Sequence, residues 1–386
     1  MHTHITLVGG QTYPIYLGIK ALNPDKIIFV HSDQTENEAK RIANEFTNKA
    51  SENICLDATD FKTINLAVEY LLRKVKNEST DEDTFTIDVS SGTKAWTIAF
   101  LEKYKSILPK LEIIYVSQKN IVYNYTKSKE YDVDSTIDLD LILRLNGTKI
   151  PNYIAFSNYT QEDVEVVKQI EKLRRSAYKS FNSLTIIKDN EKDKDRKYEL
   201  AHKNSAVWEN KGYKVSWDKV NSTISYELTT NKGDIVTGTL SSPHVIQLFF
   251  NTGWFEFKIA NLLNRWSRTK EIRMNVIFPT TKGKDDNEVD ILINAKEKIL
   301  FVECKTQVTK PTDVDKFRTV AKNFGGLASM ALFITDAPMN PVALEKCKKY
   351  GIMSFSIELA KDNKQRSIED QLFEMLEKKI NETNTR

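Results

Sequence analysis

The sequence predicts an α/β protein made of an N-terminal doubly wound sheet and a second α/β unit toward the C-terminal end. Two observations predict the first unit: short β-branched apolar segments recur through residues 1–117, and segments with helical spacing lie between them. A third observation predicts the second unit, because a pair of apolar strands with helices on either side follows residue 245. A chain of 386 residues is long enough for two or three domains, each with its own core.

Short, mostly apolar segments are the predicted strands of the first unit. They are 5–10, 27–32, 53–58, 85–90 and 112–117. Helical spacing covers 36–49, 61–76 and 94–106 between them. Because strands and helices alternate, and the strands are almost continuously apolar, we expect a parallel sheet covered on both faces. The segment 120–127 follows the fifth strand too closely for a crossover helix, which predicts an antiparallel hairpin at the sheet edge.

Glycine and proline near residue 150 predict that the first domain comprises residues 1–148. A helix is predicted over 160–181, with Thr160 as its N-cap and Asp163 reaching back as in a capping box. The charge-rich run 188–199 is predicted to be an exposed loop. Alternation over 213–240, around the turn residues NKGD, predicts a small antiparallel hairpin unit.

The second compact unit is expected to begin at residue 245, which leaves 149–244 as a helical and β-stranded connector and 245–386 as the second α/β domain. Its predicted elements are a helix near 253–265, a hairpin over 289–305, a helix near 312–324, a strand over 330–335 and a C-terminal helix.

Composition is that of an ordinary globular protein, with 40% hydrophobic and 28% charged residues and a net charge of +3. No apolar run approaches the roughly 18 residues of a membrane helix, so no membrane partner is expected. The first ten residues lack a basic stretch before an apolar one, so no signal peptide is expected. The cysteines Cys55, Cys304 and Cys347 are odd in number and lack metal-ligand spacing, which favours a reducing, cytoplasmic setting and argues against structural zinc.

One basic segment of the C-terminal part contains an aromatic side chain. Residues 264–275 carry four positive charges around Trp266. Such a segment is typical of a contact with the phosphate backbone of a nucleic acid. A solvated helix face explains the same pattern equally well, so both interpretations stay open.

Acidic residues stand at the rim of the predicted hairpin. If its strands pair about the centre of the turn, Asp290 lies opposite Glu303. Two carboxylates about 5 Å apart repel by roughly 3 kcal/mol at an effective dielectric of about 20, and a divalent cation between them, Mg²⁺ or Mn²⁺, removes that repulsion. Lys305 shares a strand face with Glu303, so its ammonium can orient a water or stabilise charge on a phosphate. A surface ion pair at a strand end is the alternative interpretation.

Glu256 adds a further acidic residue, on a predicted helix whose neighbouring residues are apolar. The order of a helical glutamate, then Asp290, twelve residues and a Glu-x-Lys resembles the PD-(D/E)xK nuclease superfamily. The Pro-Asp dipeptide of that superfamily is absent, and the sequence NEVD, with Glu288 as an extra acidic residue, stands in its place. The resemblance implies hydrolysis of DNA, RNA or both. The implied catalytic residues are Glu256, Asp290, Glu303 and Lys305, and the implied metal ligands are Asp290, Glu303 and the backbone carbonyl of Cys304.

Two loops are expected at the C-terminal edge of the N-terminal sheet, where ligands of doubly wound sheets collect. The first loop contains Gly10, Gln11 and Thr12, and the second contains Ser91, Gly92, Thr93 and Lys94. Small residues let backbone amides approach a ligand, and Lys94 opens a helix where a phosphate is favoured. Neither loop has the spacing of a dinucleotide fingerprint or a P-loop. A helix N-cap with a glycine turn is the simpler interpretation of the second loop.

Together the two loops resemble those of the CRISPR-associated Rossmann fold (CARF) sensor domain, which has a polar loop after its first strand and a Ser/Thr-Gly loop with a lysine after its fourth. A Rossmann-like CARF domain followed by a restriction-endonuclease-like PD-(D/E)xK domain is the arrangement of the cyclic-oligoadenylate-activated ancillary nucleases of type III CRISPR defence. The resemblance implies an activator, cyclic tetra-adenylate before other ring sizes, bound across the two-fold axis of a homodimer. The implied ligand residues are Gly10, Gln11, Thr12, Ser91, Gly92, Thr93 and Lys94.

Three functions stay open at this point. The first is an activated, metal-dependent nuclease, and the second is a non-catalytic regulator that senses a nucleotide and binds nucleic acid. The third is a restriction or repair nuclease with an unrelated N-terminal domain. Opposed carboxylates favour a nuclease, because a binding module has no use for them. A dehydrogenase is disfavoured because the glycine fingerprint is missing.

Overall fold

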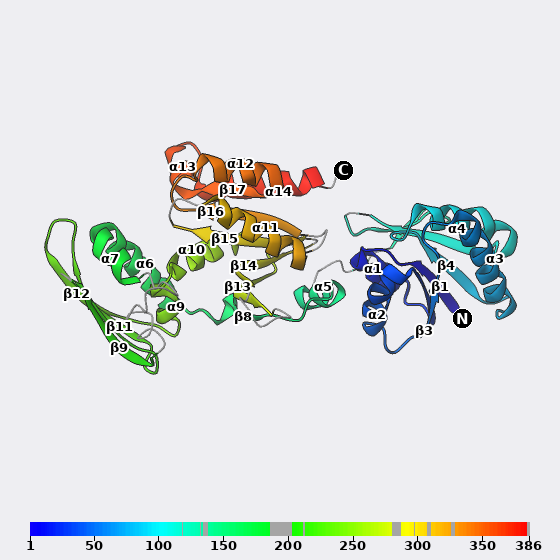
Figure 1. The fold of residues 1–386 in the computed structure, drawn as a ribbon, viewed down its shortest axis with the longest axis horizontal. Helices are drawn as coiled ribbons and strands as arrows, with labels where there is room; N and C mark the ends of the chain where they lie inside the picture. Colours follow the sequence, from blue (N-terminus) through cyan, green and yellow to red (C-terminus); the bar gives the residue numbers. More distant parts are fainter. Residues whose placement is uncertain are drawn as a thin grey trace.

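The computed structural model describes residues 1–117, 119–131, 133, 138–185, 203–210, 213–279, 287–296, 298–306, 310–325 and 329–383. These residues form a seven-stranded, a four-stranded and a six-stranded sheet with their helices. Figure 1 shows the N-terminal sheet at one end of an elongated molecule and the four-stranded sheet at the other, with the C-terminal α/β unit between them. The predicted α/β class is confirmed. The charged run predicted as a loop, 188–199, lies outside the described residues.

The N-terminal sheet has the order β3-β2-β1-β4-β5-β6-β7. Its first five strands are parallel, and the last two continue the sheet as an antiparallel edge, so the predicted parallel sheet and edge hairpin are both confirmed. The strands are β1 His2–Leu7, β2 Lys26–His31, β3 Ala50–Cys55, β4 Thr84–Asp88, β5 Leu111–Val116, β6 Val122–Asn124 and β7 Lys129–Tyr131.

Helices cover both faces of this sheet, namely α1 Thr12–Leu22, α2 Glu36–Asn44, α3 Phe61–Asn77 and α4 Lys94–Ile107. The side chains of α3 and α4 pack with one face, and those of α1 and α2 pack with the other. Helix α1 was not predicted, because its first residues were assigned to a loop. Pro14 is tolerated there since the first turn of a helix leaves its N–H groups without intrahelical acceptors.

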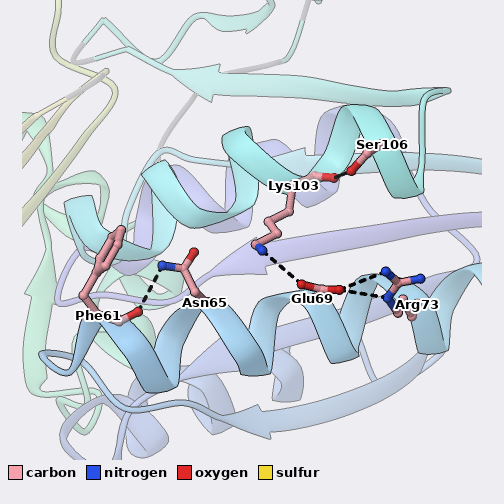
Figure 2. Close-up of polar contacts among 6 residues, drawn as sticks. All are labelled: Phe61, Asn65, Glu69, Arg73, Lys103 and Ser106. Atoms are coloured by element: carbon pink, nitrogen blue, oxygen red, sulfur yellow. Dashed lines mark hydrogen bonds and ion pairs between the residues drawn. The ribbon is translucent and has the colours of Figure 1, made fainter.

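Polar side chains hold α3 and α4 together at the surface. Figure 2 shows the two helices side by side, with Lys103 of α4 reaching toward Glu69 of α3. The Lys103 Nζ to Glu69 Oε2 distance is 3.0 Å, and Arg73 approaches the other carboxylate oxygen at 2.9 Å. Exposed pairs of this kind contribute at most about 1 kcal/mol each, so they fix the relative position of the helices more than they stabilise the fold.

Helix α5, Leu139–Leu145, lies between the N-terminal domain and the rest of the chain. Arg144 of α5 pairs with Glu45, which directly follows α2, at 2.8 Å, while Asp140 of α5 pairs with Arg273 of strand β13. The side chain of Arg273 is buried and is also paired with Glu271. The helix therefore makes ion pairs with both neighbouring units.

The predicted helix at 160–181 is in fact two helices, α6 Gln161–Ser176 and α7 Tyr178–Thr185. The capping box of Thr160 and Asp163 is confirmed. The helix ends early because Asn231 takes two of its last carbonyl groups: its N–H donates to the oxygen of Ser176 at 2.7 Å and its side chain donates to that of Arg175 at 3.0 Å. This tertiary contact could not be read from the local pattern.

The middle of the chain contributes a separate four-stranded antiparallel sheet of order β12-β11-β10-β9, which confirms and extends the predicted hairpin unit. Its strands are β9 Ser205–Asn210, β10 Tyr213–Asp218, β11 Thr223–Thr229 and β12 Ile235–Ser241. Trp217 of this sheet packs edge-on against Phe250, which directly follows the short helix α9 Val245–Phe249. The sheet thereby shares a core with the C-terminal unit.

The C-terminal sheet has the order β17-β16-β15-β14-β13-β8. Its strands are β8 Asn152–Ala155, β13 Glu271–Phe278, β14 Asn287–Ala295, β15 Lys298–Lys305, β16 Ser329–Thr335 and β17 Met353–Ser356. Strand β8 lies in the range predicted as a connector but pairs with β13 at the sheet edge. The predicted hairpin is confirmed with the expected register, since Ile291 faces Val302 and Ala295 faces Lys298.

Helices cover both faces of this sheet as well. Side chains of α10 and α14 pack on one face, and those of α11 and α12 pack on the other. The helices are α10 Gly253–Leu263, α11 Pro311–Gly325, α12 Pro341–Tyr350, α13 Ile357–Asp362 and α14 Ile368–Thr383. None of the described helices combines the length and the apolar character needed to cross a membrane.

The basic segment 264–275 is not a solvated helix face, because its last residues enter β13. Trp266 is only 2% exposed, and its indole N–H donates to Glu377 at 2.9 Å. Arg268 pairs with the same carboxylate, and the other arginines of the segment pair with acidic side chains too. The segment therefore joins β13 to α14, and its arginines are already paired with carboxylates.

Candidate functional site

Four charged side chains from three elements meet at one edge of the C-terminal sheet. Glu256 comes from α10, Asp290 from β14, and Glu303 and Lys305 from β15. The carboxylates are shielded from solvent, with Glu256 only 7% and Asp290 9% exposed. Lys305 Nζ lies 2.5 Å from Glu303 Oε1 and 4.0 Å from Asp290 Oδ2. The structure thus brings together the four residues that the sequence analysis singled out, and we refer to them as the carboxylate cluster.

The strand pairing explains the position of Asp290. Continuing the observed register by one pair sets Asp290 opposite Glu303. The backbone N–H of Cys304 donates to Asp290 Oδ2 at 2.6 Å, and the side chain of Cys304 is buried. Asp290 is therefore held in place from the neighbouring strand, while Glu303 and Lys305 share a face of β15 because side chains alternate along a strand.

Asn275 belongs to the cluster but was not predicted. It lies in β13 between the pairs Met274–Ile291 and Val276–Val289, across from Asp290. Its side chain donates to Glu256 Oε2 at 3.3 Å. Its φ of 49° is left-handed, a conformation that asparagine adopts more readily than most residues. An asparagine between the apolar residues Met274 and Val276 of a strand is the only sequence signal that could have drawn attention to it.

Burial and mutual repulsion govern the titration of the cluster. Burial raises the pKa of Glu256 well above its usual range, and the charges of Asp290 and Glu288 raise it further. Burial raises the pKa of Asp290 despite the nearby Lys305. Burial and the charge of Asp290 raise the pKa of Glu303 to about 8. Burial alone would lower the pKa of Lys305. The negative charges of Asp290 and Glu303 outweigh burial and raise this pKa, so the ammonium remains protonated.

The donor set suits a hard divalent cation. Carboxylate oxygens are the ligands that Mg²⁺ and Mn²⁺ prefer, and a cation would relieve the repulsion that raises these pKa values. Among the described residues, however, no three His, Cys, Asp or Glu side chains are gathered closely enough to hold an ion. The Glu303 carboxylate is instead turned to Lys305. The residue types therefore fit a divalent metal ion. To bind it, the Glu303 carboxylate would have to turn away from Lys305.

The two loops at the C-terminal edge of the N-terminal sheet touch each other. The N–H of Gly9 donates to Ser91 Oγ at 3.1 Å. A Cβ at Gly9 would lie 2.6 Å from the backbone nitrogen of Gly92, so only glycine fits there. Gly92 has a φ of 78°, and a Cβ on it would lie 2.8 Å from the Cβ of Leu7. The two loops are thus packed against each other.

The predicted ligand residues differ in exposure. Gly10, Gln11 and Lys94 are exposed, and Ser91, Gly92 and Thr93 are half-buried. Thr93 is the N-cap of α4, since its side chain accepts a hydrogen bond from the N–H of Trp96 at 3.2 Å. This agrees with the simpler interpretation of the second loop as a helix N-cap with a glycine turn. Thr12 is 3% exposed as the first residue of α1, and its buried hydroxyl finds no partner among the described residues.

The N-terminal domain belongs to the class of Rossmann-like domains that collect ligands at the C-terminal edge of a parallel sheet. Residues 3–141 match the model of the family described as the Card1 CARF domain. No curated protein matches the chain.

Solved structures with similar folds cover nearly the whole chain. The crystal structure of protein VC1899 from Vibrio cholerae has 14% identity and a TM-score of 0.67, covering 97% of each chain. Can2 from Sulfobacillus thermosulfidooxidans, solved in complex with cyclic tetra-adenylate, has 15% identity and a TM-score of 0.62, covering 98% of this chain and 99% of that chain.

A third solved structure, that of a type III CRISPR defence DNA nuclease activated by cyclic oligoadenylate, has 14% identity and a TM-score of 0.50. The match covers 93% of this chain and 51% of that one. At such identities the three structures show a shared fold.

Proposed function

We propose that the protein is a cyclic-oligoadenylate-activated, metal-dependent nuclease that acts as an effector of type III CRISPR defence. The observation that carries the proposal is the carboxylate cluster, in which Asp290 and Glu303 lie within 4.0 Å of Lys305 and the buried Glu256 is close enough to feel their charges. Carboxylates whose pKa values are raised by burial and by one another cost folding stability at neutral pH, and such groups are concentrated at functional sites. The similar fold of a nuclease activated by cyclic oligoadenylate supports the same function.

In this proposal Asp290, Glu303 and the backbone carbonyl of Cys304 hold Mg²⁺ or Mn²⁺. A bound ion of this kind polarises a phosphodiester oxygen and lowers the pKa of a coordinated water. Lys305 stabilises the negative charge that develops on the phosphate. Glu256 accepts a hydrogen bond from Asn275 and lies close enough to Asp290 for the charge of Asp290 to raise the pKa of Glu256. It is the fourth catalytic residue of the proposal.

The proposed activator is cyclic tetra-adenylate, bound at the loop surface of the CARF domain. The neighbour Can2 supports this ligand, since its structure contains cyclic tetra-adenylate. Exposed Lys94 at the first turn of α4 is suited to a phosphate, because the helix dipole and free N–H groups favour an anion there. The remaining ligand residues of the proposal are Gly10, Gln11, Thr12, Ser91, Gly92 and Thr93.

We also propose that the protein is a homodimer joined through α3 and α4. Leu66 and Tyr70 on α3 are 67% and 73% exposed, and Ile98 and Leu101 of α4 are exposed as well. Lys94, Ile98 and Leu101 follow one another at helical spacing, so the apolar stripe on α4 begins at the loop surface. A two-fold axis through this stripe would bring two copies of Lys94 to one cyclic ligand.

In this proposal the sensor domain comprises residues 1–148, the connector 149–244 and the nuclease domain 245–386. Coupling of ligand binding to cleavage then needs an element that contacts both the sensor and the nuclease domain. Helix α5 makes ion pairs with Glu45 beside α2 and with Arg273 of β13. Strand β13 carries Asn275, the hydrogen-bond partner of Glu256. A shift of α5 on ligand binding can therefore reach the carboxylate cluster through β13.

The proposal is tested by incubating the protein with plasmid DNA and labelled RNA, in Mg²⁺ or Mn²⁺, with and without each cyclic oligoadenylate. Cleavage of either substrate that requires both the metal and a cyclic oligoadenylate supports the proposal. A second candidate, a non-catalytic regulator, is favoured by the absence of a gathered metal-binding group among the described residues. Ligand binding without cleavage of either nucleic acid would establish that candidate instead.

A further inference from the structure

A hollow of about 300 Å³ lies between the connector helix α6 and the C-terminal sheet. Arg174 and Arg175 of α6 line one side, and Lys258 of α10 lines another. Asp336, just after β16, and Lys361 of α13 complete the wall. The volume is at the lower end of the roughly 300–1,000 Å³ of ligand pockets.

Positive charge is in excess in this hollow. Arg174 Nη1 pairs with Asp336 Oδ2 at 2.6 Å, and Lys258 Nζ pairs with Glu171 Oε1 at 2.5 Å. Arg175 and Lys361 are exposed and make no ion pair within the part of the chain that the structure describes. Two positive charges are thus left without a counter-charge.

The guanidinium of Arg174 contacts the faces of two aromatic rings. Its central carbon lies 4.9 Å from the ring centre of Trp254 and 5.6 Å from that of Tyr178. Stacking of this kind fixes the plane of the guanidinium and leaves the N–H groups directed outward in that plane. Such a fork suits a phosphate, which accepts two parallel hydrogen bonds.

The hollow begins beside the strand that carries Glu303 and Lys305 of the carboxylate cluster. The N–H of Asp336 donates to the backbone oxygen of Lys305 at 3.0 Å, so the hollow begins where β15 and β16 end. Lys258 follows Glu256 by two residues on α10, which places the two side chains on nearly opposite sides of the helix. Glu256 therefore faces the cluster, and Lys258 faces the hollow.

We propose that this hollow is a subsite for a backbone phosphate of the nucleic-acid strand, adjacent to the phosphodiester that the cluster hydrolyses. The inference rests on the proposed nuclease function. Arg175 and Lys361 supply the attraction, and Arg174 supplies the oriented N–H groups that its pair with Asp336 leaves over. Asp336 and Glu171 repel an anion, but their charges are matched by Arg174 and Lys258.

The test measures binding separately from cleavage. Full-length protein carrying Asp290→Asn, which prevents hydrolysis, is titrated into short fluorescein-labelled single strands of DNA and of RNA with cyclic tetra-adenylate present. Arg175→Gln combined with Lys361→Gln is compared with Lys348→Gln combined with Lys349→Gln. The control pair lies at the end of α12, is exposed, and removes the same charge.

We expect the Arg175/Lys361 variant to bind about tenfold more weakly, and the slope of log affinity against log salt to fall by roughly 1.4, or about 0.7 for each lost phosphate contact. The control should retain the affinity and slope of the parent. With Asp290 intact, the same double variant should raise KM more than it lowers kcat. Equal binding by the two double variants overturns the subsite even if the protein cleaves. Selective loss of binding in a protein that never cleaves supports the subsite and rejects the nuclease.

Discussion

The Glu303 carboxylate and the Lys305 ammonium lie 2.5 Å apart, Oε1 to Nζ, on one face of β15. The same nitrogen is 4.0 Å from Asp290 Oδ2. Lys305 thus partly neutralises two carboxylates that a divalent cation would otherwise neutralise. Even so, the pKa of Glu303 is raised to about 8 by burial and Asp290, so one lysine does not balance the negative charge of the cluster.

The first prediction concerns stability without metal. Because the folded-state pKa of Glu303 lies above its unfolded value, the folded protein binds more protons between pH about 4.5 and about 8. Stability should therefore fall as pH rises through this window. Glu303→Gln should weaken this dependence, part of which remains with Glu256 and Asp290. It should also raise the melting temperature at pH 8 by several degrees, since relieving a buried charge contributes roughly 1–3 kcal/mol. Thermal unfolding in chelator at pH 5 and pH 8 measures both effects.

Glu345→Gln provides the matched control, since Glu345 is exposed on α12 away from the cluster. It should change neither the melting temperature nor its pH dependence. Added Mn²⁺ should stabilise the wild type more at pH 8 than at pH 5, because protons compete with the ion for the carboxylates. A wild type and a Glu303→Gln variant with the same pH profile in chelator would refute the electrostatic account of the cluster.

The second prediction concerns activity. Asp290→Asn and Glu303→Ala should abolish activator-dependent cleavage by removing metal ligands, and Glu256→Gln should be inactive or severely slowed. Lys305→Ala should lose about a hundred- to a thousandfold in kcat, the usual effect of removing a group that stabilises developing charge. All four variants should bind cyclic tetra-adenylate like the wild type. Near-normal cleavage by purified Glu303→Ala or Lys305→Ala would show that the cluster is not the metal site.

Much of this cluster could be predicted because a hairpin has a simple register. Alternation places Glu303 and Lys305 on one face, and pairing about the turn places Asp290 opposite Glu303. The hydrogen bond from Asn275 to Glu256 could not be predicted in this way. It depends on a left-handed residue in β13, whose side chain reaches back to α10, the element that precedes β13 in the chain.

The basic segment around Trp266 shows the opposite limit of sequence analysis. Local composition indicated a nucleic-acid contact or a solvated helix, but Trp266 and Arg268 bind Glu377 more than one hundred residues later. Ion pairs between distant elements leave no local pattern. Arg175 and Lys361, which make no ion pair among the described residues, lie far apart in sequence and become neighbours only through tertiary packing.

The third prediction is a homodimer through α3 and α4. Tyr70→Glu places a charge in the exposed apolar face of α3 and should convert the dimer to a monomer in sedimentation velocity. Ile235→Glu, at a comparably exposed apolar residue of β12, should leave the dimer intact. The Tyr70 variant should also lose affinity for the activator, because each copy contributes one Lys94 to the ligand. A wild type that sediments as a monomer with and without ligand would exclude the dimer.

The last prediction concerns the coupling of the two domains. Lys94→Ala should weaken activator binding about ten- to a hundredfold, because a charge-assisted contact to a phosphate contributes roughly 1.5–3 kcal/mol. The variant should nevertheless cleave at the wild-type rate when activator is in large excess, since Lys94 belongs to α4 and the carboxylate cluster to the C-terminal sheet. The ligand shifts a pre-existing equilibrium only through its different affinities for the two states.

A titration of nuclease activity against cyclic tetra-adenylate distinguishes binding from chemistry in this variant. The curve for Lys94→Ala should move to higher activator concentration and reach the same plateau as that of the wild type. Lys103→Ala, on the same helix but paired with Glu69 of α3, removes an equal charge away from the loops and should leave the curve in place (Figure 2). If the Lys94→Ala curve overlays that of the wild type, the loop after β4 serves only as the N-cap of α4, and the activator must bind elsewhere.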